Sequence, residues 1–228
     1  DAVEIDIRFT IDNVPVLMHD ERLGRTTNDR LNRKVSSVSL EEIKLLDAGS
    51  WFDLDITDER VPTLQEALDF IDRRVDIYIE IKESFTNSIE PLMLMIEEAD
   101  MIQHVKILSF DSQILVQVKE LNEDIETVLL LSSFLGDINV LAENPVVDYY
   151  GFYQQVALNN LEYVSILQKA GKGVVVWTVN DDTLIREVNN LGIDGIITDT
   201  PLLAREIVYS DTTNTVYRQL LEKLFNRN

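Results

Sequence analysis

The 228-residue chain is long enough for one large domain or two small ones, and its 45% hydrophobic residues can supply a sizeable core. Its 20 basic and 41 acidic residues give a net charge of −21, which argues against a nucleic-acid surface and against unaided docking on an anionic membrane. Cysteine is absent, so disulfides, thiolate nucleophiles and sulfur-ligated metals are excluded. No uninterrupted apolar run approaches the ~20 residues of a membrane-spanning helix.

The chain opens with a predicted strand and hairpin over residues 2–20 (AVEIDIRFTIDNVPVLMHD). Strand alternation places Glu4 and Asp6 on one face. Two neighbouring carboxylates are costly to bury unless a cation or a shared proton compensates, and a hard metal ion is the simplest compensation. The returning arm of the hairpin carries His19 and Asp20 at its tip. An isolated acid pair on an edge strand more often faces solvent, so this interpretation depends on further motifs.

Predicted helices and strands then alternate along the chain. Ser39 and Thr63 are predicted to cap two helices, the first ending near residue 49 and the second covering residues 64–74. Later strands are predicted at residues 75–82, 105–110, 126–131, 148–152, 173–179 and 195–198. Later helices are predicted at residues 89–99, 112–121, 161–170, 182–191 and from residue 201 onward, and residues 132–144 carry no clear pattern.

This alternation predicts an α/β fold with a parallel sheet covered by helices. The strand units fit the spacing of an eight-fold β/α barrel of the TIM type, with one unit too few. A doubly wound open sheet is the alternative, but the Gly-rich phosphate turn typical of it is missing. We predict a barrel domain at residues 1–210 and a C-terminal helical extension at residues 211–228. Catalytic groups of a barrel lie at the carboxyl ends of its strands, where we expect Glu4, Asp6, Glu80, Lys82, Phe110, Trp177, Asn180 and Asp199.

An ordered set of motifs at these spacings resembles the glycerophosphodiester phosphodiesterase family. The matching segments are VEIDIR, VLMHDERLGRTTN, VPTLQEAL, IEIK, ILSF, VVWTVND and DGIITDTP, which together cover nearly the whole chain. The resemblance implies a barrel of the phospholipase C-like phosphodiesterase kind. It also implies metal-dependent hydrolysis of small glycerophosphodiesters to glycerol 3-phosphate and an alcohol, and a place in glycerol and lipid metabolism.

The resemblance also implies roles for particular residues. Glu4, Asp6 and Glu80 correspond to the family's ligands for one divalent cation, usually Ca²⁺ or Mg²⁺. His19 corresponds to one of two catalytic histidines, and Lys82 to a contact of the substrate phosphate. The chemistry agrees, because three carboxylates suit a hard cation and a histidine can protonate a departing alkoxide. Trp177 is expected either to line the pocket of the glycerol or alcohol or to cap the barrel core.

The chain departs from the family pattern at its start. The family motif begins with a His-Arg pair and a helix that precede residue 1 of this chain. We therefore expect one catalytic histidine, a phosphate-binding arginine and the first β/α unit to lie upstream, and these residues alone to be inactive. His104 is predicted at the opposite end of the barrel and cannot replace the missing histidine.

Two alternatives to this function remain, namely a catalytically inactive barrel that acts as a binding or regulatory module and a cyclising phospholipase or lyase. Members of the family occur in the cytosol, in secreted form and as outward-facing domains of membrane-anchored proteins. The acidic surface and the start in mid-domain favour an extracytoplasmic domain of a membrane-anchored bacterial protein, with a cytoplasmic protein as the alternative. Composition and motifs give no oligomeric state.

Overall fold

The computed structural model describes residues 1–83 and 86–210. The extension predicted at residues 211–228 lies outside the described residues. The chain divides into two compact units, Asp1–Leu129 and Leu130–Asn228. Among the described helices, none has the length and apolar character that crossing a membrane requires.

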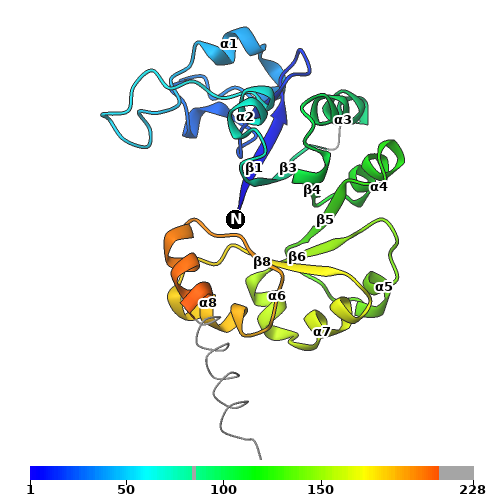
Figure 1. Ribbon diagram of the computed structural model, residues 1–228. Helices are drawn as coiled ribbons and strands as arrows, with labels where there is room; N and C mark the ends of the chain where they lie inside the picture. The colour runs from blue at the N-terminus through cyan, green and yellow to red at the C-terminus, as the bar shows by residue number, and fades with distance from the viewer. Residues whose placement is uncertain (84–85, 211–228) are drawn as a thin grey trace, which may run out of the picture. The chain divides into compact units, whose positions relative to one another are not determined.

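The first unit is built on a sheet whose strands run in the order β2-β1-β3-β4-β5 (Figure 1). These strands are β1 (Ala2–Phe9), β2 (Pro15–Leu17), β3 (Asp76–Ile81), β4 (Val105–Ser109) and β5 (Glu126–Leu131), the last of which runs into the second unit. β2 pairs antiparallel with β1, and all the other pairs in this unit are parallel. Ile77, Ile79, Ile107 and Val128 are fully buried in it. β-Branched residues pack well on a pleated surface, which is why these short apolar segments form strands.

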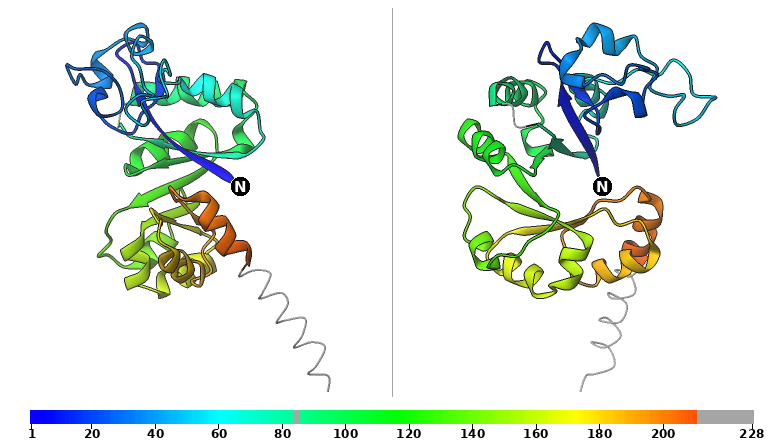
Figure 2. Two further views of the ribbon diagram at one scale, coloured as in Figure 1. Left: turned by 90° about the vertical axis from the view of Figure 1, so that its left-hand side faces the viewer. Right: turned by 180° about the vertical axis from the view of Figure 1, so that it is seen from behind.

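Four α-helices accompany the sheet of the first unit: α1 (Leu40–Lys44), α2 (Leu64–Ile71), α3 (Ile89–Glu98) and α4 (Ser112–Leu121). Capping boxes start α1 at Ser39 and α2 at Thr63, as the sequence predicts. α1 ends earlier than predicted, because the Asp47 carboxylate accepts main-chain hydrogen bonds that close a turn. α2 ends at Ile71, where Asp72 takes a left-handed conformation with φ of 43°. α3 and α4 lie side by side (Figure 2).

The hairpin and the segment after it enclose a small core of their own. This segment contains the 3₁₀ turns η1 (Leu23–Arg25) and η2 (Val35–Ser37). Two further 3₁₀ turns, η3 (Thr86–Ser88) and η4 (Ile102–His104), precede α3 and β4. The buried cluster consists of Val16, Met18, Leu23, Val35, Val38, Ile43 and Val61. Burial of these side chains fixes β2 against the sheet, and therefore fixes the residues that follow β2.

The second unit carries the three parallel strands β6 (Tyr149–Tyr153), β7 (Gly173–Trp177) and β8 (Gly195–Ile196). Its helices are α5 (Ile138–Ala142), α6 (Gln154–Asn159), α7 (Glu162–Lys169) and α8 (Asp182–Asn189), and residues 201–210 are also helical. α5 and α6 were not predicted, because five or six residues are too few to show a helical period. Alternating strands and helices in both units confirm the predicted α/β class.

Candidate active site

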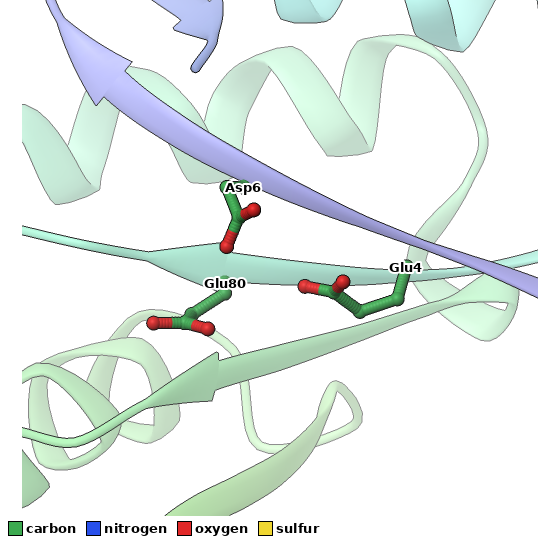
Figure 3. Close-up of side chains that lie close together, drawn as sticks. All are labelled: Glu4, Asp6 and Glu80. Atoms are coloured by element: carbon green, nitrogen blue, oxygen red, sulfur yellow. The ribbon is translucent and has the colours of Figure 1, made fainter. Parts of the chain in front are cut away.

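Three carboxylates from β1 and β3 converge on one space (Figure 3). Glu4 and Asp6 share one face of β1, and Asp6 lies directly opposite Glu80 in the parallel β1–β3 pair. One carboxylate oxygen from each of Glu4, Asp6 and Glu80 lies within 4.8 Å of the others. Glu80 is only 7% exposed. The folded chain therefore brings Glu80 to the pair of carboxylates that strand alternation places on one face of β1.

Lys82 provides the local positive charge at this cluster. Its Nζ lies 2.8 Å from Asp6 Oδ1 and 2.7 Å from Glu80 Oε1. Burial raises the pKa of the Glu80 carboxyl, and the Lys82 ammonium opposes this rise. Burial would lower the pKa of Lys82, but its hydrogen bonds to Asp6 and Glu80 outweigh burial and raise it. Lys82 is thus a fully charged cation inside the acidic cluster.

The donor set fits a hard divalent cation. Ca²⁺ and Mg²⁺ prefer oxygen ligands, and all three converging side chains are carboxylates. Lys82 brings one positive charge to the three carboxylates, which leaves negative charge at the cluster. A divalent cation would neutralise this charge, and one Ca²⁺ or Mg²⁺ therefore suits these residues.

His19 is fixed next to the acidic cluster by the main chain. The amide of Met18 donates a 2.9 Å hydrogen bond to the carbonyl of Asp6, which ties the residue before His19 to the cluster. His19 Nδ1 lies 2.9 Å from Asp20 Oδ1, and Arg25 donates to both oxygens of Asp20. With Nδ1 engaged by the carboxylate, Nε2 is the ring nitrogen left to face a reactant. The His19 side chain is 64% exposed, so solvent and ligands can reach it.

A second ion pair lies on the same face of β1. Arg8 Nη1 lies 2.6 Å from Glu83 Oε1, and the two side chains are 13% and 14% exposed. Arg8 Nε also donates a 3.0 Å hydrogen bond to the main-chain carbonyl of His19. Burial raises the pKa of the Glu83 carboxyl, and Arg8 opposes this rise. Arg8 therefore joins β1, the end of β3 and the histidine segment.

Five of the six predicted site residues belong to the first unit and surround one space: Glu4, Asp6, His19, Glu80 and Lys82. Trp177 belongs to the second unit, where its Nε1 donates a 2.9 Å hydrogen bond to the carbonyl of Gly151 and its ring packs on Tyr153. These contacts tie Trp177 to its own sheet, and its role in substrate binding stays a prediction. Asn180 and Asp199 hydrogen bond to each other, as expected of residues that fix loop ends.

Sequence reasoning missed Arg8 and Glu83 and gave Asp20 no role beyond its position next to His19. Arg8 carried a usable signal, because period-two alternation puts it on the same strand face as Glu4 and Asp6. Glu83 and Arg25 carried none, because they lie in segments without a regular period.

The comparisons with known proteins agree with this geometry. Residues 1–203 match the model of the glycerophosphoryl diester phosphodiesterase family. A glycerophosphodiester phosphodiesterase of Caldanaerobacter subterraneus is 32% identical over 206 residues, which are 88% of this chain and 83% of that protein. A glycerophosphodiester phosphodiesterase of Bacillus subtilis is 29% identical and covers 91% of this chain, which spans 76% of that protein.

Solved structures share the fold. An Oleispira antarctica phosphodiesterase, crystallised with the product sn-glycerol-3-phosphate, has a TM-score of 0.79 and 27% identity, with 91% of this chain and 85% of that chain covered. A glycerophosphodiester phosphodiesterase from Agrobacterium tumefaciens has a TM-score of 0.75 and 24% identity, with 90% of this chain and 86% of that chain covered. These likenesses confirm the predicted fold class, a TIM-type α/β barrel.

Proposed function

Because this chain belongs to the glycerophosphoryl diester phosphodiesterase family, we propose that it hydrolyses glycerophosphodiesters with the help of one divalent cation held by Glu4, Asp6 and Glu80. The products are glycerol 3-phosphate and an alcohol. One observation carries the proposal, namely the convergence of three carboxylates and Lys82 beside an accessible histidine. The product named for the Oleispira antarctica enzyme is of the same kind.

Binding of the substrate phosphate falls to Lys82. A bound Ca²⁺ or Mg²⁺ supplies Lewis-acid stabilisation of the phosphate charge. We assign contact with the same phosphate anion to the Lys82 ammonium, and its position within the acidic cluster supports this role. Asp6 and Glu80 keep this ammonium charged and oriented, so little reorganisation is needed when the substrate arrives.

Departure of the alcohol requires a proton. An oxygen nucleophile, either water or the neighbouring glycerol hydroxyl with water completing the hydrolysis, bonds to phosphorus as the bond between phosphorus and the alcohol oxygen breaks. The leaving oxygen takes the electron pair of that bond and a proton from His19 Nε2. Asp20 accepts from Nδ1 and holds the ring in this orientation, and Arg25 holds Asp20. Arg8 fixes the main chain of His19.

The test uses the full-length protein that contains these residues. Release of glycerol 3-phosphate from glycerophosphocholine and from glycerophosphoglycerol is measured before chelation, after chelation and after Ca²⁺ or Mg²⁺ is added back. We expect the chelator to abolish release and the cation to restore it. Equal hydrolysis after metal removal would refute the role of the cation. A cyclic phosphate as the final product would instead identify a cyclising relative, and no product from any diester would refute the enzyme itself.

A further inference from the structure

A cavity of about 680 Å³, wide open to solvent, lies beside His19 in the first unit. Apart from Arg8, its lining comes from the segment between His19 and Asn32. Four arginines line it: Arg8, Arg22, Arg25 and Arg30. This gathering of cations is unexpected in a protein with 20 basic residues against 41 acidic ones.

The charges around the cavity do not cancel. Each of its three carboxylates has a cationic partner, since Asp20 pairs with Arg25, Glu21 with Lys34, and Asp29 with Arg33, which also pairs with Glu42. Arg8 pairs with Glu83. Arg22 and Arg30 form no ion pair with any carboxylate in the described part of the chain. Arg22 and Arg30 are therefore the guanidinium groups at the cavity that no ion pair with a described carboxylate engages.

The wall that holds Arg22 is locked by hydrogen bonds. Arg22 Nη1 donates to the main-chain carbonyl of Asn32 at 2.9 Å, and the amide of Gly24 donates to Asn32 Oδ1 at 3.0 Å. A Cβ at Gly24 would lie 2.6 Å from the same Oδ1, so any larger residue here would displace the Asn32 side chain from this hydrogen bond. An isolated bridge between Arg22 and Lys34 joins the two strands of the loop. A binding group fixed in this way loses little conformational entropy when a ligand arrives.

The cavity lies where the leaving alcohol of the substrate is expected, because His19 lines it. A general acid acts only on an oxygen within hydrogen-bond reach of its proton, so the alcohol part of the substrate must lie against His19. The cavity is the space next to His19 that lies along the arginine-bearing segment. Guanidinium groups bind phosphate in a bidentate manner and remain charged at any ordinary pH.

Building on the proposed hydrolysis, we propose that this cavity is a subsite for an alcohol group that carries a second phosphate. Arg22 and Arg30 bind that phosphate. The rest of the protein carries a net negative charge and should not attract a phosphate. The preferred substrates are then glycerophosphodiesters with a second anionic phosphorus centre. Diesters of neutral or cationic alcohols are weaker substrates.

Two matched pairs of substrates test this inference. The first pair is glycerophosphoinositol 4-phosphate and glycerophosphoinositol, and the second is bis(glycerophospho)glycerol and glycerophosphoglycerol. The members of the first pair differ by one phosphate monoester. Those of the second pair differ by one glycerophosphoryl group, which adds a second phosphate as a diester. We expect kcat/KM to be at least about tenfold higher for the phosphate-rich member of one or both pairs, and this ratio to fall as salt is added. The pair with the larger ratio identifies the source of the phosphate.

Variants connect the preference to the arginines. Arg30→Gln and Arg22→Gln should each remove most of the ratio and leave hydrolysis of glycerophosphoglycerol within about twofold, because neutral alcohols do not use these charges. Arg60→Gln removes the same charge outside the cavity and should leave the ratio unchanged. Arg30→Gln is the safer variant for folding, since Arg30 is exposed and is not tied to Asn32 as Arg22 is. Arg30→Lys, which keeps the charge but not the planar fork, should retain part of the ratio.

The outcomes separate this inference from the proposed function. Metal-dependent hydrolysis without any preference in either pair, or with a preference that survives both arginine variants, overturns the subsite alone. If no diester is hydrolysed, calorimetry with glycerophosphoinositol 4-phosphate still tests the cavity. Binding should then be about tenfold tighter than for glycerophosphoinositol and should weaken in Arg30→Gln. Equal binding of the two compounds overturns the inference.

Discussion

Arg8 Nε donates a 3.0 Å hydrogen bond to the main-chain carbonyl of His19, while its Nη1 pairs with Glu83 at 2.6 Å. One largely buried guanidinium thus joins the proposed catalytic histidine to a carboxylate beyond the end of β3. The contact is to the main chain of His19. Arg8 therefore fixes the position of the His19 backbone and does not touch the imidazole ring. Arg8 acts as a positioning residue.

Variants of Arg8 should therefore distinguish its effect on the position of His19 from its effect on the stability of the fold. Arg8→Met should lower kcat about tenfold to a hundredfold with little change in KM, because a small displacement of a proton donor is costly. It should also lower the free energy of unfolding by about 1 to 3 kcal/mol, because the buried Glu83 carboxylate loses its partner. Steady-state kinetics and urea unfolding measure the two effects.

The double variant Arg8→Met, Glu83→Met is the control for this prediction. It removes both partners of the ion pair and should recover most of the lost stability, since two apolar side chains can replace a buried pair. Turnover should stay low, because the hydrogen bond to His19 is still missing. Recovery of full turnover together with stability would mean that Arg8 has only a structural role.

Glu80→Gln should abolish turnover and leave the fold intact. The change removes one of the three negative charges and so weakens cation binding, while Lys82 keeps Asp6 as a partner at 2.8 Å. Repulsion among the carboxylates is relieved, so stability in metal-free buffer should hold or rise. We expect Ca²⁺ or Mg²⁺ to raise the melting temperature of the unmodified protein and to leave that of the variant unchanged.

Asp76→Asn is the matched control for Glu80→Gln. Asp76 lies on the same strand, but it is exposed and pairs with His104. This variant should keep both turnover and the metal-induced rise in melting temperature. A Glu80→Gln protein that behaves like the Asp76→Asn protein would contradict the assignment of the site.

Lys82→Met should change cation affinity and turnover in opposite directions. Without the ammonium between Asp6 and Glu80, cation binding to the substrate-free protein should tighten about tenfold, because a repelling charge has gone. Metal-free stability should fall by about 1 to 3 kcal/mol, because the carboxylates lose their counter-charge. Turnover should also fall, because the phosphate loses a ligand. Calorimetric titration with Ca²⁺ and Mg²⁺ measures the affinity, and unchanged affinity would exclude Lys82 from the site.

The hydrogen bonds of Asp20 with Arg25 and His19 should make the stability of the fold depend on pH. Hydrogen bonds from Arg25 are the main reason why the pKa of Asp20 lies well below its ordinary value of 3.8. A lowered pKa adds stability that is fully present above the ordinary value and is lost as the pH falls toward the folded-state value. Asp20→Asn should therefore cost about 1 kcal/mol or less at neutral pH and less still at about pH 3.

Urea unfolding of both proteins at the two pH values measures this difference. The same difference at both pH values would show that charge on Asp20 does not stabilise the fold. Activity of the variant at neutral pH gives a second measurement, since the His19 ring loses its carboxylate partner and kcat should fall.

Period-two alternation was sufficient to predict which residues share a strand face. Glu4 and Asp6 on β1, and Glu80 and Lys82 on β3, follow directly from it. The closeness of the two pairs does not, because it depends on the register that sets Asp6 opposite Glu80. That register joins segments far apart in the chain, and the resemblance to a known family supplied what the periodicity could not.

The arginine-lined cavity was beyond prediction from the residues alone. The segment between His19 and Lys34 contains only the short turn η1 (Leu23–Arg25) as regular structure, so no period reports where its side chains point. Main-chain and side-chain hydrogen bonds such as that from Gly24 to Asn32 set its conformation. Local composition showed the charges, but only the folded loop shows which of them remain unpaired.

The register of β1 against β3 also links cation binding to correct folding of the chain. A slip of one residue between these strands would turn a whole set of side chains to the opposite face, and Asp6 would no longer meet Glu80. A misassembled molecule would then be unable to bind the cation at all, and would not merely bind it weakly. The number of cations bound per chain in a preparation should therefore count the correctly folded fraction, independently of any assay of turnover.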